Sequence, residues 1–185
     1  MEKKSSRYTT RDLVVMAFLI AVSGPFQVLW AHLNFNLKVL GPFTALFSNA
    51  GFMFWGFLTL YLVPKPGSAT LVKGIGAVIE VLLGNPVGPV AIAYGALEGV
   101  AVDLAFLAFR QRISVEMMIV GALFSQALTA PIDFFRDRVP FQFLAMAAYW
   151  APGVAGTVLT GYVSSLLLRL LQRAGVKGGV RVQAS

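Results

Sequence analysis

The sequence predicts an all-α membrane protein, a single domain over residues 1–185 built as a bundle of six transmembrane helices with both termini cytoplasmic. Three observations support this prediction. Apolar residues make up 57% of the chain and charged residues only 12%, with a mean hydropathy of +0.75. A surface exposed to water does not tolerate that composition. Several apolar runs approach the ~20 residues that cross a bilayer, and most Lys and Arg residues stand between these runs.

Hydropathy places the helices at roughly 11–31, 42–63, 68–84, 90–109, 114–131 and 141–171, separated by short connections rich in Pro, Gly, Asn or charge. The third segment is the weakest, because it is short and contains Lys73, Glu80 and two glycines; we expect it to be tilted, broken or buried in protein. Segments 1–10 and 175–185 are expected to be cytoplasmic tails. The first apolar run is expected to be retained, since Pro25 and a tryptophan follow it in place of a cleavage site.

The distribution of Lys and Arg orients the predicted bundle. Loops that stay in the cytoplasm are enriched in these residues. The loops around 32–41, 84–89 and 132–140 form the poorer side, with Lys38, Arg136 and Arg138, and are therefore external. The other 12 of the 15 cations fall on the cytoplasmic side: Lys3, Lys4, Arg7, Arg11, Lys65, Lys73, Arg110, Arg112, Arg169, Arg173, Lys177 and Arg181. We expect a multi-pass protein of the bacterial inner membrane.

Several classes of function are excluded by what the chain lacks. It has no cysteine and a single histidine, so thiolate and imidazole metal sites and disulfides are not expected, and no cofactor is implied. The basic residues form no stripe with interleaved aromatics, so nucleic acid is not an expected partner. No Walker A, GxSxG or HExxH signature occurs, so we do not expect an enzyme. Any accumulation of a substrate would draw its energy from a partner.

Three acids fall within the predicted spans, where an ionisable group costs at least ~2.5–3.5 kcal/mol and needs a partner or a purpose. Glu80 lies near the outer end of the third helix, Glu98 near the middle of the fourth, and Asp103 closer to the cytoplasm. Tyr94 precedes Glu98 by four residues and shares its face, which suits an organic cation or an amino-heterocycle. Alternatively, Glu98 and Asp103 pair with Lys73 or Arg110, or hydrogen-bond a neighbouring helix, to hold the fold.

Two outer segments are candidates to cover a ligand. The turn at residues 84–89 contains Asn85, two prolines and two glycines; it could cap a pocket or simply connect two helices. The segment at residues 30–36 combines Trp30, His32 and Asn34 and is interpreted as a loop that would suit a lid. An interfacial aromatic belt with polar neighbours is the alternative.

The outer halves of the last two helices add further candidates. Gln126 lies in the fifth helix, and Tyr149 and Trp150 lie in the sixth. An aromatic side chain there could stack on a flat ligand, although such stripes more often pack a bundle. Asp133 and Arg136 are expected in a solvated outer loop.

Small residues recur at four-residue spacing and allow helices to approach closely in lipid. Ala91, Gly95 and Gly99 in the fourth helix are expected to pack the bundle internally, as are Gly153, Thr157 and Gly161 in the sixth. Ala17 and Ala21 in the first helix could equally accept a helix from another protein.

The chain resembles the substrate-binding S components of bacterial energy-coupling factor (ECF) transporters. The resemblance rests on six helices in under 200 residues, the lead-in Thr9-Thr10-Arg11-Asp12 and the step Ala17-Phe18-Leu19-Ile20-Ala21. It implies that Ala17 and Ala21 contact a coupling transmembrane subunit, which is bound in turn to two ATPase subunits.

Within that family the chain is most similar to the YkoE type, associated with thiamine and its hydroxymethylpyrimidine precursor. The similarity lies in the segments 80–89, EVLLGNPVGP, and 94–99, YGALEG. It implies a vitamin ligand held by acids, amides and aromatic faces, with Glu80, Glu98, Gln126, Tyr149 and Trp150 supplying those residue types. Two alternatives remain open: an S component for another vitamin or small heterocycle, and a membrane scaffold or small membrane enzyme without a transported ligand.

Overall fold

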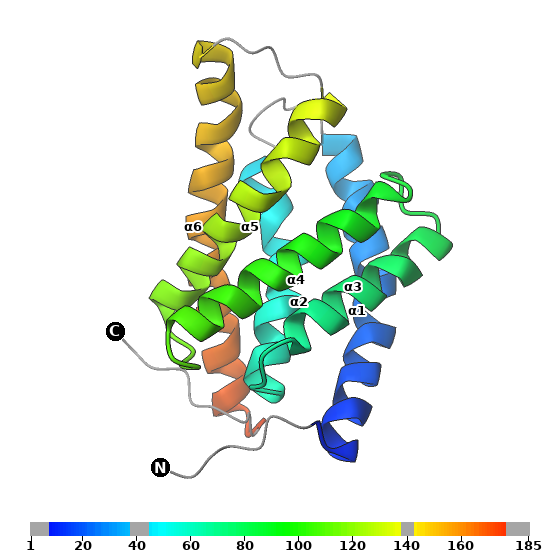
Figure 1. Ribbon diagram of the computed structural model, residues 1–185, viewed down its shortest axis with the longest axis vertical. Coiled ribbons are helices and arrows are strands. Elements are labelled where there is room, and N and C mark those ends of the chain that lie inside the picture. Colours follow the sequence, from blue (N-terminus) through cyan, green and yellow to red (C-terminus); the bar gives the residue numbers. More distant parts are fainter. Residues whose placement is uncertain (1–7, 38–44, 138–142, 177–185) are drawn as a thin grey trace.

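The protein folds into six helices, as the sequence predicts. The computed structural model describes residues 8–37, 45–137 and 143–176, without the side chains of residues 45–50, 137 and 143–150. The helices are α1 Thr10–Asn36, α2 Ala45–Leu62, α3 Ser68–Leu82, α4 Val90–Ala108, α5 Val115–Asp137 and α6 Phe143–Arg173. Figure 1 shows that α1 begins and α6 ends at the same end of the bundle, so both chain ends approach one side of the membrane.

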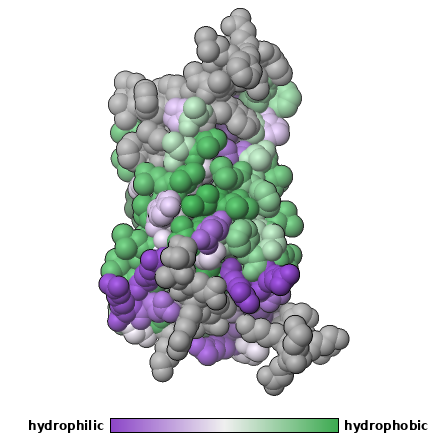
Figure 2. All heavy atoms as spheres, turned by 90° about the vertical axis from the view of Figure 1, so that its left-hand side faces the viewer, coloured by the Kyte–Doolittle hydropathy of each residue, from purple (hydrophilic) through white to green (hydrophobic). Residues whose placement is uncertain are grey.

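A belt of apolar side chains surrounds the middle of the molecule (Figure 2), and the strongly hydrophilic side chains on this face gather toward the end where α1 begins. Four helices, α1, α4, α5 and α6, are long and apolar enough to span a membrane. The third helix has 15 residues, which corresponds to a rise of only about 22 Å. It lies obliquely beside α4 (Figure 1), as expected for a short segment packed against protein.

The second helix supplies much of the core. Its buried side chains pack against α4, α5 and α6, as Phe57, Leu60 and Tyr61 do in the larger cluster, or against α1, as Trp55 does in the smaller one. The phenol of Tyr61 donates to the carbonyl of Val176, just beyond α6. An apolar helix that is buried on several sides needs no strongly polar face, and this accounts for its composition.

Two of the predicted helix ends are wrong. The first helix continues to Asn36 and the fifth to Asp137, so residues 32–36 and 132–137 are helical and not parts of external loops. Pro25 and Pro131 both lie inside these helices. Proline removes one backbone hydrogen bond, but membrane helices tolerate it where neighbouring groups satisfy the backbone.

The expected cytoplasmic tail at residues 1–10 is shortened by contacts at its end. Thr9 caps α1 through a reciprocal capping box with Asp12, and Tyr8 donates from its phenol to the carbonyl of Pro66. Lys65 pairs with Asp12 at 2.7 Å. These contacts tie the start of α1 to the α2–α3 connection. The residues before Tyr8 and after Val176 lie outside the described part of the chain.

The glycines of α4 pack directly on α3, which confirms the prediction of internal packing for this helix. A Cβ atom at Gly99 would lie 2.5 Å from the Cα of Thr70, and one at Gly95 would lie 2.7 Å from the carbonyl oxygen of Lys73. In α6, Gly161 packs in the same way against Ile119 of α5. Backbone approach of this kind is possible only with small residues.

We expect Gly99→Ala to destabilise the protein by about 1–3 kcal/mol, because the added methyl group meets backbone that cannot move aside. Gly74→Ala is the matched control. A Cβ at Gly74 meets nothing within 4 Å, so alanine should stabilise α3 by about 0.5–1 kcal/mol. Thermal unfolding in detergent measures both, and equal shifts would contradict the packing seen at Gly99.

Asp103 has a structural contact within the bundle. Its carboxylate accepts from the backbone N–H of Thr70 at 2.9 Å and from the Thr70 hydroxyl at 2.6 Å. Thr70 lies in the first turn of α3, where backbone N–H groups have no partner within the helix. Asp103 therefore caps α3 from α4, which is the structural alternative that the sequence allows for this acid.

Candidate ligand site

Lys73 joins four helices at a buried polar cluster. Its side chain is 2% exposed, and its Nζ lies 2.7 Å from a carboxylate oxygen of Glu98 on α4. The same ammonium donates to the side-chain oxygen of Gln27 on α1 at 2.6 Å and to the carbonyl of Phe52 on α2 at 3.0 Å. An ammonium away from water needs this number of acceptors to offset its lost hydration.

The alternative interpretation of Glu98 is thus the one that the geometry shows: it pairs with Lys73. Lys73 does not belong to the cytoplasmic cations, which leaves the asymmetry of charge otherwise unchanged. The amide nitrogen of Gln27 is buried and has no hydrogen-bond partner among the residues described. Buried polar groups ordinarily have partners, so this nitrogen is available to a further acceptor.

Glu80 lies on the same side of α3 as Lys73, two turns closer to the outer end. It is 4% exposed, and its carboxylate accepts from the amide nitrogen of Asn85 at 2.9 Å. Asn85 belongs to the turn at residues 84–89, in which its side-chain oxygen accepts from the N–H of Val87. Gly84 and Gly88 in this turn have φ values of 87° and 69°, a conformation that favours glycine. The turn therefore holds Asn85 against Glu80.

The charges of this region do not balance. Lys73 and Glu98 form one ion pair, and both charges act on the carboxyl of Glu80. Within the described residues, no Lys or Arg lies at ion-pair distance from Glu80. Two carboxylates thus share one ammonium, and a positively charged or amino-bearing group beside Glu80 would supply the missing partner.

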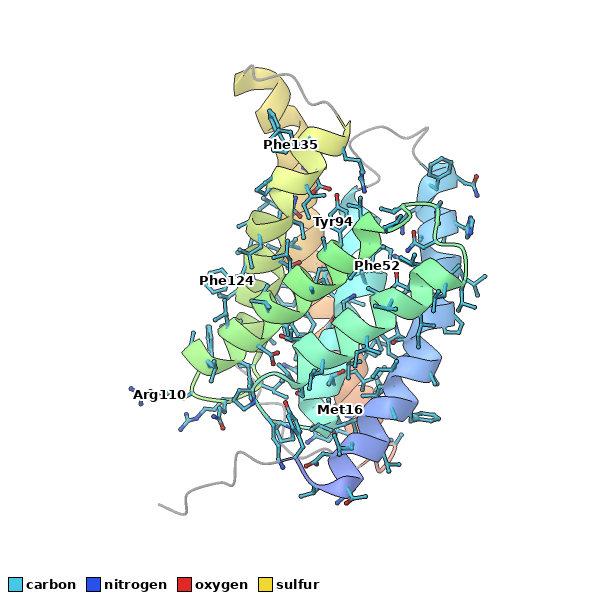
Figure 3. The ribbon with its side chains drawn as sticks, turned by 45° about the vertical axis from the view of Figure 1, so that its right-hand side comes forward. Met16, Phe52, Tyr94, Arg110, Phe124 and Phe135 are labelled. Carbon is cyan, nitrogen blue, oxygen red and sulfur yellow. The ribbon has the colours of Figure 1, made fainter. Side chains whose placement is uncertain are left out.

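Tyr94 and Glu98 share a face of α4 but have different partners. The phenol of Tyr94 donates to the carboxylate of Asp133 on α5. Arg136 lies over the Tyr94 ring at 5.3 Å and 3.7 Å from Asp133. The expected solvated loop around Asp133 and Arg136 is therefore wrong, since both stand on α5 and contact α4. Tyr94 lies in the upper half of the bundle, above Phe52 (Figure 3).

The interpretation of residues 30–36 as a lid loop is wrong, because these residues complete α1. Trp30 stacks on Phe26 at 6.1 Å and lies against Gly51 of α2, where a Cβ would be 2.3 Å from the indole. Asn34 donates to the carbonyl of Trp30 within the helix, and His32 is exposed. None of the three is brought to Glu80 or Glu98 by a contact in the described structure.

The candidates on α5 and α6 divide into two groups. Gln126 lies against α6, since a Cβ at Gly153 would be 2.6 Å from its amide nitrogen. Tyr149 and Trp150 lie on α6, but their side chains are outside the described part of the structure.

Sequence reasoning passed over two residues of this site. Lys73 appeared there only as an alternative partner, and Gln27 did not appear. Gln27 is fully buried in the middle of α1, a polar residue in an otherwise apolar span. That is the signal that could have identified it, since polar groups inside membrane helices seek partners on neighbouring helices.

Residues 11–128 match the family described as "ABC-type cobalt transport system, permease component". The chain belongs to this family. It is accordingly a multi-pass membrane protein and a component of a transporter, not an enzyme.

Two further similarities span nearly the whole permease component. It is 25% identical over 187 residues to a protein of Bacillus subtilis (strain 168) named "Putative HMP/thiamine permease protein YkoE", covering 94% of this chain and 89% of that one. A solved structure titled "Crystal structure of an S-component of ECF transporter" has a TM-score of 0.80, 23% identity, and coverage of 94% and 90%. The fold is therefore that of an ECF S component, as the resemblance implied.

Proposed function

We propose that this chain is the substrate-binding subunit of an ECF importer that takes up thiamine or its hydroxymethylpyrimidine precursor. The observation that carries the proposal is Glu80, a buried carboxylate whose partner is a neutral amide, beside a Lys73–Glu98 pair that is already balanced. Thiamine carries a permanent positive charge and an aminopyrimidine. The B. subtilis relative, named for HMP and thiamine, supports the same substrate class.

In this proposal Glu80 contacts the ligand, and Asn85 holds its carboxylate in place. Glu98 adds negative potential while remaining tied to Lys73. Tyr94, Gln126, Tyr149 and Trp150 are proposed as the polar and aromatic contacts that recognise a flat heterocycle, and Trp30, His32 and Asn34 are retained only as the outer end of α1 near this region.

Titration of the purified protein by calorimetry or intrinsic tryptophan fluorescence tests the substrate. We expect saturable binding of thiamine and hydroxymethylpyrimidine, each displacing the other, and none of riboflavin as a different heterocycle. Co²⁺ is included because the family description names cobalt. Binding of Co²⁺ or riboflavin with no response to either pyrimidine compound would reject the thiamine assignment.

The proposed partners are a coupling transmembrane subunit and two ATPase subunits, with the coupling subunit docking on α1. Ala17 and Ala21 are both exposed on that helix, together with Val14, 63% exposed, and Phe18, 66% exposed. Two alanines one turn apart form a shallow groove between larger side chains, which permits close approach of another helix.

We expect Ala17→Leu with Ala21→Leu to reduce copurification with the coupling subunit and substrate uptake by about tenfold or more, since the added side chains block close helix approach. Thiamine binding by the isolated protein should be unchanged. Ala155→Leu on the exposed face of α6 is the control for added bulk. Normal uptake by the double variant would place the partner elsewhere.

A further inference from the structure

The turn between α4 and α5 contains two consecutive non-glycine residues in the left-handed conformation. Arg110 has φ of 53° and Gln111 has φ of 61°. The N–H of Gln111 donates to the carbonyl of Phe106, and the N–H of Arg110 donates to that of Leu107, which is the hydrogen-bond pattern that ends many helices. Glycine is the usual residue at such a position, so arginine is kept here despite its conformational cost.

The side chains of this turn are free to meet a ligand. Arg110, Gln111 and Arg112 are all exposed. Neither arginine forms an ion pair with any residue in the described ranges. The acid nearest in the sequence is Glu116, which hydrogen-bonds to Ser114 at the start of α5. Two guanidinium groups therefore face the surroundings within three residues.

The turn lies where the membrane meets the cytoplasm. Leu104 and Leu107, in the last turns of α4, are each 47% exposed, and Phe124 on α5 is 42% exposed; apolar side chains with this exposure contact lipid in a membrane. In Figure 3, Phe124 lies on the same edge of the bundle as Arg110, which extends sideways below it, away from the helices. Arg110 is thus directed toward lipid headgroups rather than toward the bundle.

We propose that Arg110 and Arg112 form a binding site for the phosphate of an anionic phospholipid in the cytoplasmic leaflet. Guanidinium groups bind phosphate oxygens through paired hydrogen bonds, and basic residues beside a membrane are attracted to anionic headgroups. The left-handed turn presents Arg110 outward, which explains why glycine does not occupy that position. This site is independent of the transported substrate.

Two glycine substitutions separate the charge from the backbone strain. Arg110→Gly and Gln111→Gly each relieve one left-handed residue, but only the first removes a cation. The full-length protein is reconstituted in phosphatidylcholine vesicles with and without phosphatidylglycerol, and its thermal unfolding midpoint is measured. We expect anionic lipid to raise the midpoint of the wild type and of Gln111→Gly equally, and to raise that of Arg110→Gly by roughly half as much, since one of two cations is lost.

Three further results decide the proposal. Added KCl should shrink the effect of anionic lipid, because an exposed charge pair is screened. Equal responses of Arg110→Gly and Gln111→Gly to phosphatidylglycerol would overturn the site. Inorganic phosphate that reproduced the stabilisation in neutral vesicles would make the ligand a soluble anion. A normal lipid response of Arg110→Gly with impaired assembly on the coupling and ATPase subunits would make the turn a protein contact. Either of these last two outcomes also rejects the lipid assignment.

Discussion

Glu80→Gln is expected to weaken thiamine binding by about 10- to 100-fold. The substitution keeps the size of the side chain and its ability to accept from Asn85, which now bonds to the Glu80 carboxylate at 2.9 Å. It removes the negative charge that Lys73 does not balance. Hydrogen bonds to charged groups contribute about 1.5–3 kcal/mol, and 1.4 kcal/mol corresponds to a factor of ten in affinity. Calorimetric titration measures the change directly.

Glu116→Gln is the matched control for this experiment, because it makes the same chemical change at an exposed position. Its thiamine affinity should equal that of the wild type. Glu80→Gln should also unfold at a temperature no lower than the wild type, since removing a buried charge that lacks a cation relieves a desolvation cost. Unchanged affinity in Glu80→Gln would remove this residue from the ligand site.

Lys73→Met is expected to have the largest effect on stability, a loss of about 3–5 kcal/mol. The substitution leaves Glu98 buried with no cation, and it leaves the side-chain oxygen of Gln27 and the carbonyl of Phe52 without the donor seen in the structure. Thermal unfolding in detergent should show a much lower midpoint.

Lys65→Met provides a matched control for Lys73→Met. Lys65 pairs with Asp12 at the same 2.7 Å, but the two side chains are 19% and 17% exposed, so the loss should be at most about 1 kcal/mol. Adding Glu98→Gln to Lys73→Met should restore part of the stability, since no unpaired charge then remains buried. Losses that simply add in the double variant would show that the two residues are not coupled.

The amino-acid sequence by itself determined the membrane class and the number of helices. Hydropathy is a local property, and a run long enough to cross lipid must form a helix that satisfies its own backbone. The same locality explains why the glycine stripe of α4 identified internal packing, which the contacts of Gly95 and Gly99 with α3 confirm. The imbalance of Lys and Arg likewise needs no tertiary information, and it agrees with the hydrophilic side chains at the cytoplasmic end (Figure 2).

Only the tertiary structure decided the roles of the buried charges and the ends of two helices. The sequence allowed Glu98 to face a ligand or pair with Lys73, and the choice depends on α3 lying against α4, 25 residues apart in the chain. Asp103 caps α3 for the same reason. Helices α1 and α5 continue past their prolines because neighbouring helices pack along them. Contacts between distant segments set these outcomes, and no local pattern of residues encodes such contacts.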